Sequence, residues 1–250
     1  MKLKNSYLKI MLWILGGLII GVVGAIIGSY GIEKAREGLE AASSFLITNI
    51  FWIQLTVGIG FSIISIANFY KSKNLMSNSV GDDTEDDTDN LEENIDIRQG
   101  KALVFSSINY IASFTLFGIA IDQNNNWFIG SIIIFLGVIF FSSFMDITVV
   151  NLVKKREPLK KGDPAEMKFE KEWIDSCDEA EKYMIYQASY KTFTMMKYTL
   201  LGALVLTVIS KQAFNTGNFA IVLVGALWLV QTISFNVQSG KQENIKGISS

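Results

Sequence analysis

Two charged residues stand inside long apolar runs of this sequence, and they are the residues best placed to do chemistry. Asp146 lies near the end of one run and Lys197 near the start of another. An ionisable residue inside a membrane is a functional candidate by default, because its charge must be paired, hydrated or neutralised there. The two residues predict either a structural ion pair close to the cytoplasmic edge or a proton-coupling carboxylate at Asp146.

The histidine and cysteine content excludes several kinds of catalytic site. The chain has no histidine and a single cysteine, Cys177. It therefore lacks an imidazole base, a His–Ser or His–Cys nucleophile pair and the thiolates of a metal cage. The acidic run that starts at Asp82 has no glycine at the sixth position, where a calcium loop needs one. We expect no catalytic site, metal or cofactor, and we predict that the protein is not an enzyme.

Membrane-crossing elements must position these residues, because six apolar stretches divide the sequence. Half of the 250 residues are apolar, two are prolines, and no segment has the alternation of a membrane β-barrel. Most stretches approach the roughly 20 residues that a helix needs to cross a bilayer. They are Leu8–Tyr30, Phe45–Phe69, Ala102–Ile121, Trp127–Val150, Met195–Lys211 and Phe219–Phe235. We predict an all-α, polytopic membrane helix bundle over residues 1–250, with six transmembrane helices arranged as three hairpins.

Positive charge is distributed unequally between the two sides of this arrangement. Of the 22 Lys and Arg residues, all but Lys34, Arg36 and Lys211 lie on one side. Cytoplasmic segments of membrane proteins carry such an excess, so we predict that both termini are cytoplasmic. The first apolar stretch is too long for the apolar region of a signal peptide, and we interpret it as an uncleaved anchor.

The two long cytoplasmic connections differ in character. Residues 71–100 contain an acidic run and predict a solvated, flexible loop. Residues 151–194 begin with the basic stretch KKREPLKK, which either attracts anionic lipid headgroups or only sets the topology. A helix start follows, since Asp163 can cap a helix and Pro164 suits the first helical position. We predict an amphipathic cytoplasmic helix over 164–188, before the fifth span.

One face of this predicted helix is apolar and includes Phe169, Trp173, Cys177 and Met184. An apolar face must be buried, and three environments are open to it: the protein's own bundle, the lipid interface, or a groove of a cytoplasmic partner protein. These four residues are the candidate partner surface.

Four glycines line one face of the first span: Gly17, Gly21, Gly24 and Gly28. Glycine lets helix backbones approach closely, and such packing stabilises helix pairs in lipid. The pattern predicts a helix-packing face, which either contacts another span of the same chain or forms a homodimer.

The stretch from Lys160 to Phe193 resembles a bacterial membrane-protein family that is known as domain of unknown function 3169. The likeness is carried by the Gly-Asp-Pro helix start, Trp173, the run Ser176–Glu181 and the run Tyr190–Phe193, and it includes the six-span layout. It implies an integral protein of the bacterial plasma membrane and implies no activity. Members are often encoded beside small helix-turn-helix regulators, which suggests a membrane protein that restrains a transcription factor.

Two hypotheses for the function follow. The first is a non-enzymatic regulatory or sensory membrane protein that binds a cytoplasmic protein through the 164–188 helix and does not bind nucleic acid directly. The second is a transporter or permease-like subunit, in which Asp146 couples to protons. The scarcity of charged residues deep in the spans and the absence of interrupted helices favour the first.

Overall fold

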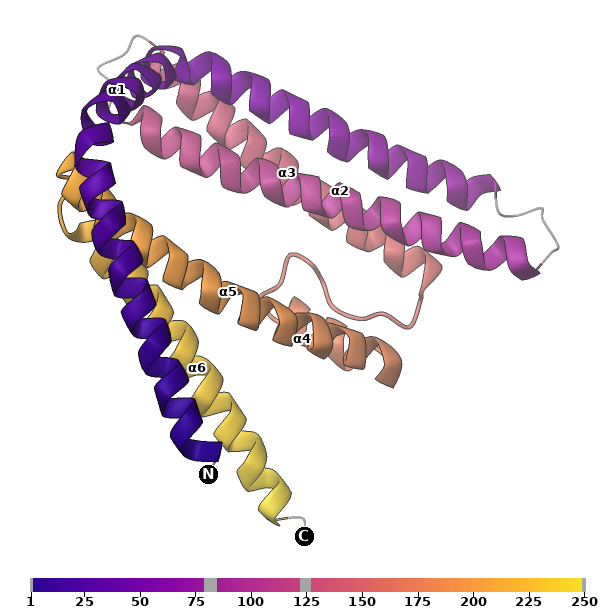
Figure 1. Cartoon of the computed structure of the whole chain (residues 1–250). Coiled ribbons are helices and arrows are strands. Elements are labelled where there is room, and N and C mark those ends of the chain that lie inside the picture. The colour runs from indigo at the N-terminus through magenta and orange to yellow at the C-terminus, as the bar shows by residue number, and fades with distance from the viewer. Residues whose placement is uncertain (1, 79–84, 122–126, 249–250) are drawn as a thin grey trace. The chain divides into compact units, whose positions relative to one another are not determined.

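The computed structural model of the chain is all-helical over the residues that it describes, as predicted (Figure 1). The backbone is described for residues 2–78, 85–121 and 127–248, and the side chains for 37–38, 40–77, 90–121, 127–212 and 214–238. The helices are α1 (Lys2–Asn78), α2 (Glu85–Ala120), α3 (Phe128–Arg156), α4 (Phe169–Asp175), α5 (Glu179–Phe214) and α6 (Phe219–Ile248).

Five segments among the described residues are long and apolar enough to cross a membrane. They are Glu40–Ser77, Asn90–Ala120, Phe128–Arg156, Glu179–Gln212 and Phe219–Gln238. Each covers one of the apolar stretches seen in the sequence, in full or to within one residue. The shortest has 20 residues, which at about 1.5 Å per residue matches the roughly 30 Å of the hydrocarbon core. The protein therefore has the helices of a multi-pass membrane protein. The side chains of the remaining stretch, Leu8–Tyr30, lie outside the described residues.

The first predicted hairpin has no non-helical turn, because α1 continues through residues 31–44 as part of a single helix of 77 residues. We expected a connecting segment between two helices at this place. The intervening sequence IEKAREGLEAASS has several strong helix formers, including Ala, Glu, Lys and Arg, and it has no proline. Local propensity therefore favours an uninterrupted helix over a turn.

The acidic segment 71–100 is also largely helical, which corrects the predicted flexible loop. Helix α1 ends only at Asn78, and α2 begins at Glu85. The first residues of α2 are Glu85, Asp86 and Asp87. A run of acids therefore does not by itself prevent this segment from forming a helix.

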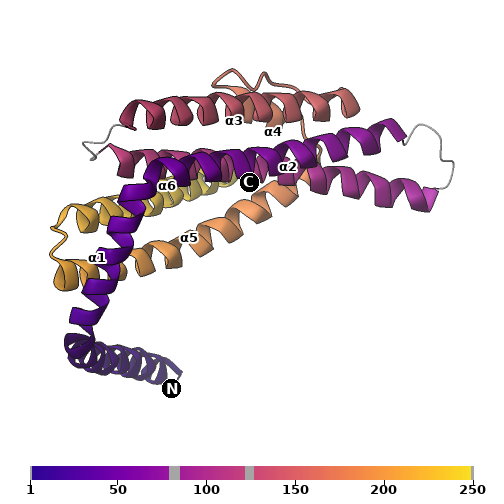
Figure 2. The same ribbon diagram turned by 90° about the horizontal axis from the view of Figure 1, so that it is seen from above.

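The chain divides into two compact units, which are described separately. One consists of residues 42–182 and is called here the three-helix unit; the other consists of residues 1–41 and 183–250 and is called the hairpin unit. In the three-helix unit, the second half of α1 runs alongside α2 and α3 (Figures 1 and 2). Rings pack at one end of this unit, where Phe51 stacks on Trp127 with centroids 4.8 Å apart.

The interior of the three-helix unit is rich in small polar residues, and many of them bond across helices. Ser65 Oγ donates to the carbonyl of Ala102 at 2.8 Å, and Asn109 Nδ2 donates to the carbonyl of Gly58 at 3.1 Å. Gln54 Nε2 donates to the carbonyl of Ser131 at 3.2 Å. Small and polar side chains hold helices together in lipid, where apolar burial offers little. These bonds form a polar seam that joins α1 to both α2 and α3.

In the hairpin unit, α5 and α6 form an antiparallel pair. Phe193 near the start of α5 stacks on Phe235 of α6, with ring centroids 4.0 Å apart. Gln231 Nε2 donates to the carbonyl of Phe193 at 3.3 Å. The short turn between the helices includes Gly217 with a φ of 77°, a left-handed conformation that glycine adopts without strain.

Candidate functional site

The connection between α3 and α5 has a different local structure from the one predicted. Asp163 does not begin a helix; its Oδ1 accepts a hydrogen bond from the N–H of Ala165 at 2.9 Å, and its carbonyl accepts one from Glu166 at 2.8 Å. These bonds close a turn. Just before it, Gly162 has a φ of 99°, and a Cβ there would lie 3.1 Å from Phe169. The chain turns sharply at this glycine, and α4 begins only at Phe169.

The predicted helix over 164–188 is in fact two helices with a break at 176–178. Asp178 Oδ1 accepts a hydrogen bond from the N–H of Glu181 at 2.7 Å, and Glu181 Oε2 accepts one from the N–H of Asp178 at 2.9 Å. This reciprocal pair is a capping box, which marks the start of a helix. The sequence contains the required spacing of Asp178 and Glu181. The continuous apolar stripe across the break obscured it, so the prediction of one amphipathic helix was wrong.

A buried lysine organises this connection. Lys160 Nζ forms an ion pair with the Glu181 carboxylate, and it lies 3.3 Å from Cys177 Sγ and 5.7 Å from the ring centroid of Trp173. Only 7% of the Lys160 side chain is exposed. Burial of a charge is costly unless it is paired, and here the carboxylate and the aromatic face compensate it. We call Lys160, Trp173, Cys177 and Glu181 the lysine clasp.

The electrostatics of the clasp stabilise both of its charges. Burial by itself lowers the pKa of Lys160, but the hydrogen bonds to Glu181 and Cys177 outweigh it, so this pKa lies above its ordinary value. The hydrogen bond from Lys160 is the main reason that the pKa of Glu181 lies below its ordinary value. Glu181 is in the first turn of α5, well before the apolar run that starts at Met195. The arrangement therefore favours the charged form of both groups.

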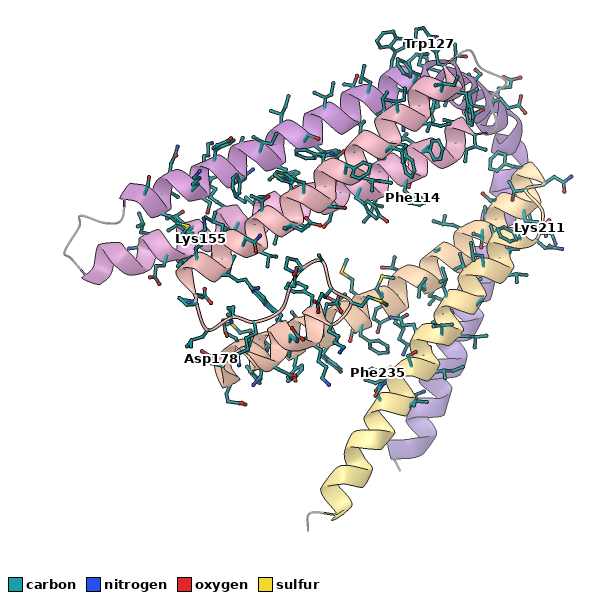
Figure 3. All side chains as sticks on the ribbon, turned by 180° about the vertical axis from the view of Figure 1, so that it is seen from behind. Phe114, Trp127, Lys155, Asp178, Lys211 and Phe235 are labelled. Atoms are coloured by element: carbon teal, nitrogen blue, oxygen red, sulfur yellow. The ribbon has the colours of Figure 1, made fainter. Side chains whose placement is uncertain are left out.

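Two further bases of the KKREPLKK stretch bond within the three-helix unit. Arg156 forms ion pairs with Asp96 of α2 and with Glu157, and Lys154 donates to the carbonyl of Gly162. Figure 3 shows Lys155 at the end of α3 and Asp178 at the start of α5, with the connection running between them. Lys155 and Lys161 are exposed, so the attraction of this stretch to lipid headgroups stays a prediction.

The four residues of the predicted partner surface do not share one exposed face. Phe169 and Trp173 pack on each other with ring centroids 5.5 Å apart, and both are half-buried. Cys177 is only 6% exposed, and its Sγ donates to the carbonyl of Trp173. Met184 is 61% exposed in its own unit. Phe169, Trp173 and Cys177 therefore make their contacts inside the three-helix unit.

Asp146 lies on α3 beside a polar pocket. The pocket has a volume of about 420 Å³ and is lined by Ser107, Tyr110, Ile111, Ser142, Ser143 and Asp146. The Oδ1 atom of Asp146 is buried and has no hydrogen-bond partner among the described atoms. Lys197 belongs to the hairpin unit and is exposed there, so an Asp146–Lys197 pair stays a prediction.

The glycine face of the first span stays a prediction as well, because Gly17, Gly21, Gly24 and Gly28 lie where the structure describes only the backbone. Within the described part of the chain, no three His, Cys, Asp or Glu side chains gather as ligands for a metal ion.

Comparison with known proteins gives a match to one protein family. No curated protein and no solved structure matches the chain. The sequence does match a protein family over residues 4–238, which include all five described membrane-spanning segments and the lysine clasp. The family carries no assigned activity. The chain therefore belongs to the family described as Protein of unknown function (DUF3169).

Proposed function

We propose that this chain is a non-enzymatic regulatory protein of the bacterial plasma membrane, which passes the state of its membrane helices to a cytoplasmic protein through the connection between α3 and α5. The lysine clasp is the observation that carries this proposal. A flexible connection would pass little of a movement of the membrane helices on to a bound cytoplasmic protein. A connection held by the ion pair of Lys160 and Glu181 moves with the helices that anchor it.

A series of charges links the clasp to the rest of the three-helix unit. Asp96 of α2 pairs with Arg156 at the end of α3, and Arg156 pairs with Glu157. Lys160 lies 3.7 Å from Glu157 and pairs with Glu181 at the start of α5. The first turn of α5 belongs to the three-helix unit and the rest to the hairpin unit. A change in the packing of α2 against α3 would therefore strain the clasp at the start of α5.

Two exposed apolar side chains of the connection between α3 and α5 are candidate contacts for a partner. Leu159 is 84% exposed and Met167 is fully exposed, although neither lies in an apolar stretch. A partner that covers them would remove apolar surface from water. We therefore place the partner contact at Leu159 and Met167, in place of the predicted surface that includes Trp173 and Cys177.

Photocrosslinking in living cells tests this proposal. A crosslinking amino acid at Met167 should capture one cytoplasmic protein, identified by mass spectrometry. Lys160→Met, which opens the clasp, should change the yield of that product several-fold. Lys161→Met removes an exposed base next to it and should leave the yield unchanged. Crosslinks to lipid alone, or equal yields in both variants, would contradict a regulatory role for the clasp.

The pocket at Asp146 supports a second function, proton-coupled transport. One oxygen of the Asp146 carboxylate is buried without a hydrogen-bond partner among the described atoms, and an ionisable group in an apolar span is a candidate for proton exchange because its charge is costly in lipid. If Asp146 exchanges protons, a hydrophobic carbodiimide should modify it near neutral pH, and Asp146→Asn should abolish that modification. Absence of any modification at Asp146 would remove this candidate.

A further inference from the structure

A second pocket lies at the end of α1, between it and α2, and its lining is cationic. It has a volume of about 310 Å³ and is lined by Lys71, Asn74, Leu75 and Arg98. Within the described residues, neither Lys71 nor Arg98 forms an ion pair with a carboxylate. Two positive charges thus converge on one hollow with no acid among its lining residues.

The guanidinium of Arg98 is held in place by a chain of hydrogen bonds. Arg98 Nη1 donates to Asn68 Oδ1 at 3.2 Å, and Asn68 Nδ2 in turn donates to the carbonyl of Ile64 at 2.8 Å. The second bond orients the Asn68 amide so that its oxygen faces Arg98. Only one Arg98 donor is used in this way, and the guanidinium has others to offer a ligand.

The wall behind the pocket is well packed. Ser72 of α1 and Ile95 and Gln99 of α2 are all buried, and Gln99 Nε2 contacts Met76 Sδ at 3.8 Å. Because these residues join the two helices on either side of the hollow, the backbone positions of residues 71 and 98 are set by the fold. Of the two bases, Arg98 is held by its hydrogen bond to Asn68, and a group that is already oriented loses less entropy when a ligand binds.

The positions nearest to Arg98 on its helical face are not acidic. Side chains that share a helical face are three or four residues apart, and the residues at those distances before Arg98 are Ile95 and Asn94. Glu92, Glu93 and Asp96 have other spacings from Arg98. The segment of α1 from residue 64 to 78 has no acid at all. Two bases and no acid therefore line the hollow.

We propose that this pocket binds a phosphate group. An arginine fork and a lysine ammonium are the donors that proteins use for phosphate oxygens, and the Asn74 amide adds a neutral donor. The apolar stretch of α1 ends at Phe69, two residues before Lys71, which is where a helix leaving a bilayer meets the lipid headgroups. The phosphate belongs either to an anionic phospholipid or to a soluble phosphate compound, and the two sources share the same chemistry.

Binding measurements on the purified full chain in non-ionic detergent test this proposal. The probes are dihexanoylphosphatidylglycerol, dihexanoylglycerol as the same lipid without phosphate, and inorganic phosphate. The pocket variant is Lys71→Gln with Arg98→Gln. The matched control is Lys73→Gln with Lys101→Gln, which removes the same charge from exposed positions outside the pocket. Lys71→Gln alone serves as a variant that cannot disturb the fold, since Lys71 is exposed.

We expect the phosphatidylglycerol or the phosphate to bind the wild-type chain, and dihexanoylglycerol not to bind. The pocket variant should bind at least about tenfold more weakly, since each base near a membrane surface contributes several-fold in affinity. Lys71→Gln alone should show part of that loss, and the control pair should show little. Tighter binding of phosphatidylglycerol than of inorganic phosphate identifies a headgroup site; binding of inorganic phosphate that is as tight as that of the lipid identifies a site for a soluble phosphate compound. Equal losses in both double variants, or no binding of either probe, would overturn the proposal.

Discussion

Lys160 is the residue whose role changed most between the sequence and the structure. In the sequence it is one base of a charged stretch, and such stretches usually remain in solvent. In the structure its side chain is buried against Trp173 and Glu181. An ion pair that is buried in this way is destabilised strongly when one partner is removed, because the other charge is left without compensation. The clasp therefore depends on Lys160 more than on any exposed base nearby.

Loss of Lys160 should expose Cys177. We expect Lys160→Met to raise the rate at which a maleimide labels Cys177 by about tenfold, which corresponds to about 1.4 kcal/mol. The reason is that Cys177 packs under Trp173 and beside the ammonium of Lys160. Lys161→Met is the matched control, and it should leave the labelling rate near that of the wild type. Equal labelling rates in the two variants would show that the clasp does not hold this connection.

The charges of the clasp also predict its dependence on pH. The pKa of Glu181 is lowered in the folded state. Its contribution to the stability of the clasp is therefore complete above the unfolded-state pKa of about 4.3, and it is lost as the pH falls through the folded-state pKa. The pKa of Lys160 is raised in the folded state. Its contribution to the stability of the clasp is therefore complete below the unfolded-state pKa of about 10.4, and it is lost as the pH rises through the folded-state pKa. We expect the clasp to be constant from about pH 5 to 9 and to open only below about pH 4 or above about pH 11.

Fluorescence of Trp173, measured with the other tryptophans replaced by phenylalanine, follows this dependence. The emission should be constant between about pH 5 and 9 and should change on strong acidification. Lys160→Met should lack the acid transition. A transition centred near neutral pH would mean that another group controls the clasp.

At the scale of elements, the helices of the three-helix unit are held by close approach and by polar bonds in place of a large apolar core. The approach is close at Gly58, where an added Cβ would lie 2.9 Å from a methyl group of Val138. Asn109 also donates to the carbonyl of Gly58. A glycine at this position therefore lets α1, α2 and α3 meet.

Matched alanine substitutions test this packing. We expect Gly58→Ala to lower the unfolding free energy by about 1–3 kcal/mol, because Val138 must shift to admit the new methyl group. Gly60→Ala meets open space, since no atom lies within 4 Å of its added Cβ, and should be neutral or stabilising by up to about 1 kcal/mol. Thermal unfolding of both variants in detergent measures the difference. Similar midpoints for the two would argue against close packing at Gly58.

The whole molecule combines membrane-spanning segments with a marked charge asymmetry. Both features are compatible with a regulatory protein and with a transporter. The topology is therefore a separate prediction, which a direct measurement can test. In a Cys177→Ser background, we expect Asn218→Cys, between α5 and α6, to react with a membrane-impermeant maleimide on intact cells. Lys155→Cys should react only after the cells are opened, because it lies on the positively charged side. The opposite pattern would reverse the predicted orientation.

Much of the architecture is encoded locally and was readable from the sequence. The apolar stretches that cross a membrane and the all-helical class follow from length, hydropathy and helix propensity, which are properties of short segments. Asp146 was also singled out, because a charge in an apolar stretch is visible without a fold. Helix boundaries were less predictable, since the capping box at Asp178 stabilises structure through its position within a helix.

Only the tertiary structure decided which polar residues work together. Lys160 meets Glu181, Arg156 meets Asp96, and Arg98 faces the same hollow as Lys71, although the members of each pair are far apart in the sequence. Hydropathy and spacing describe one segment at a time, so they cannot show which charges the folded chain brings together. The clasp and the cationic pocket arise because packed helices fix the positions of side chains that are free in isolated segments.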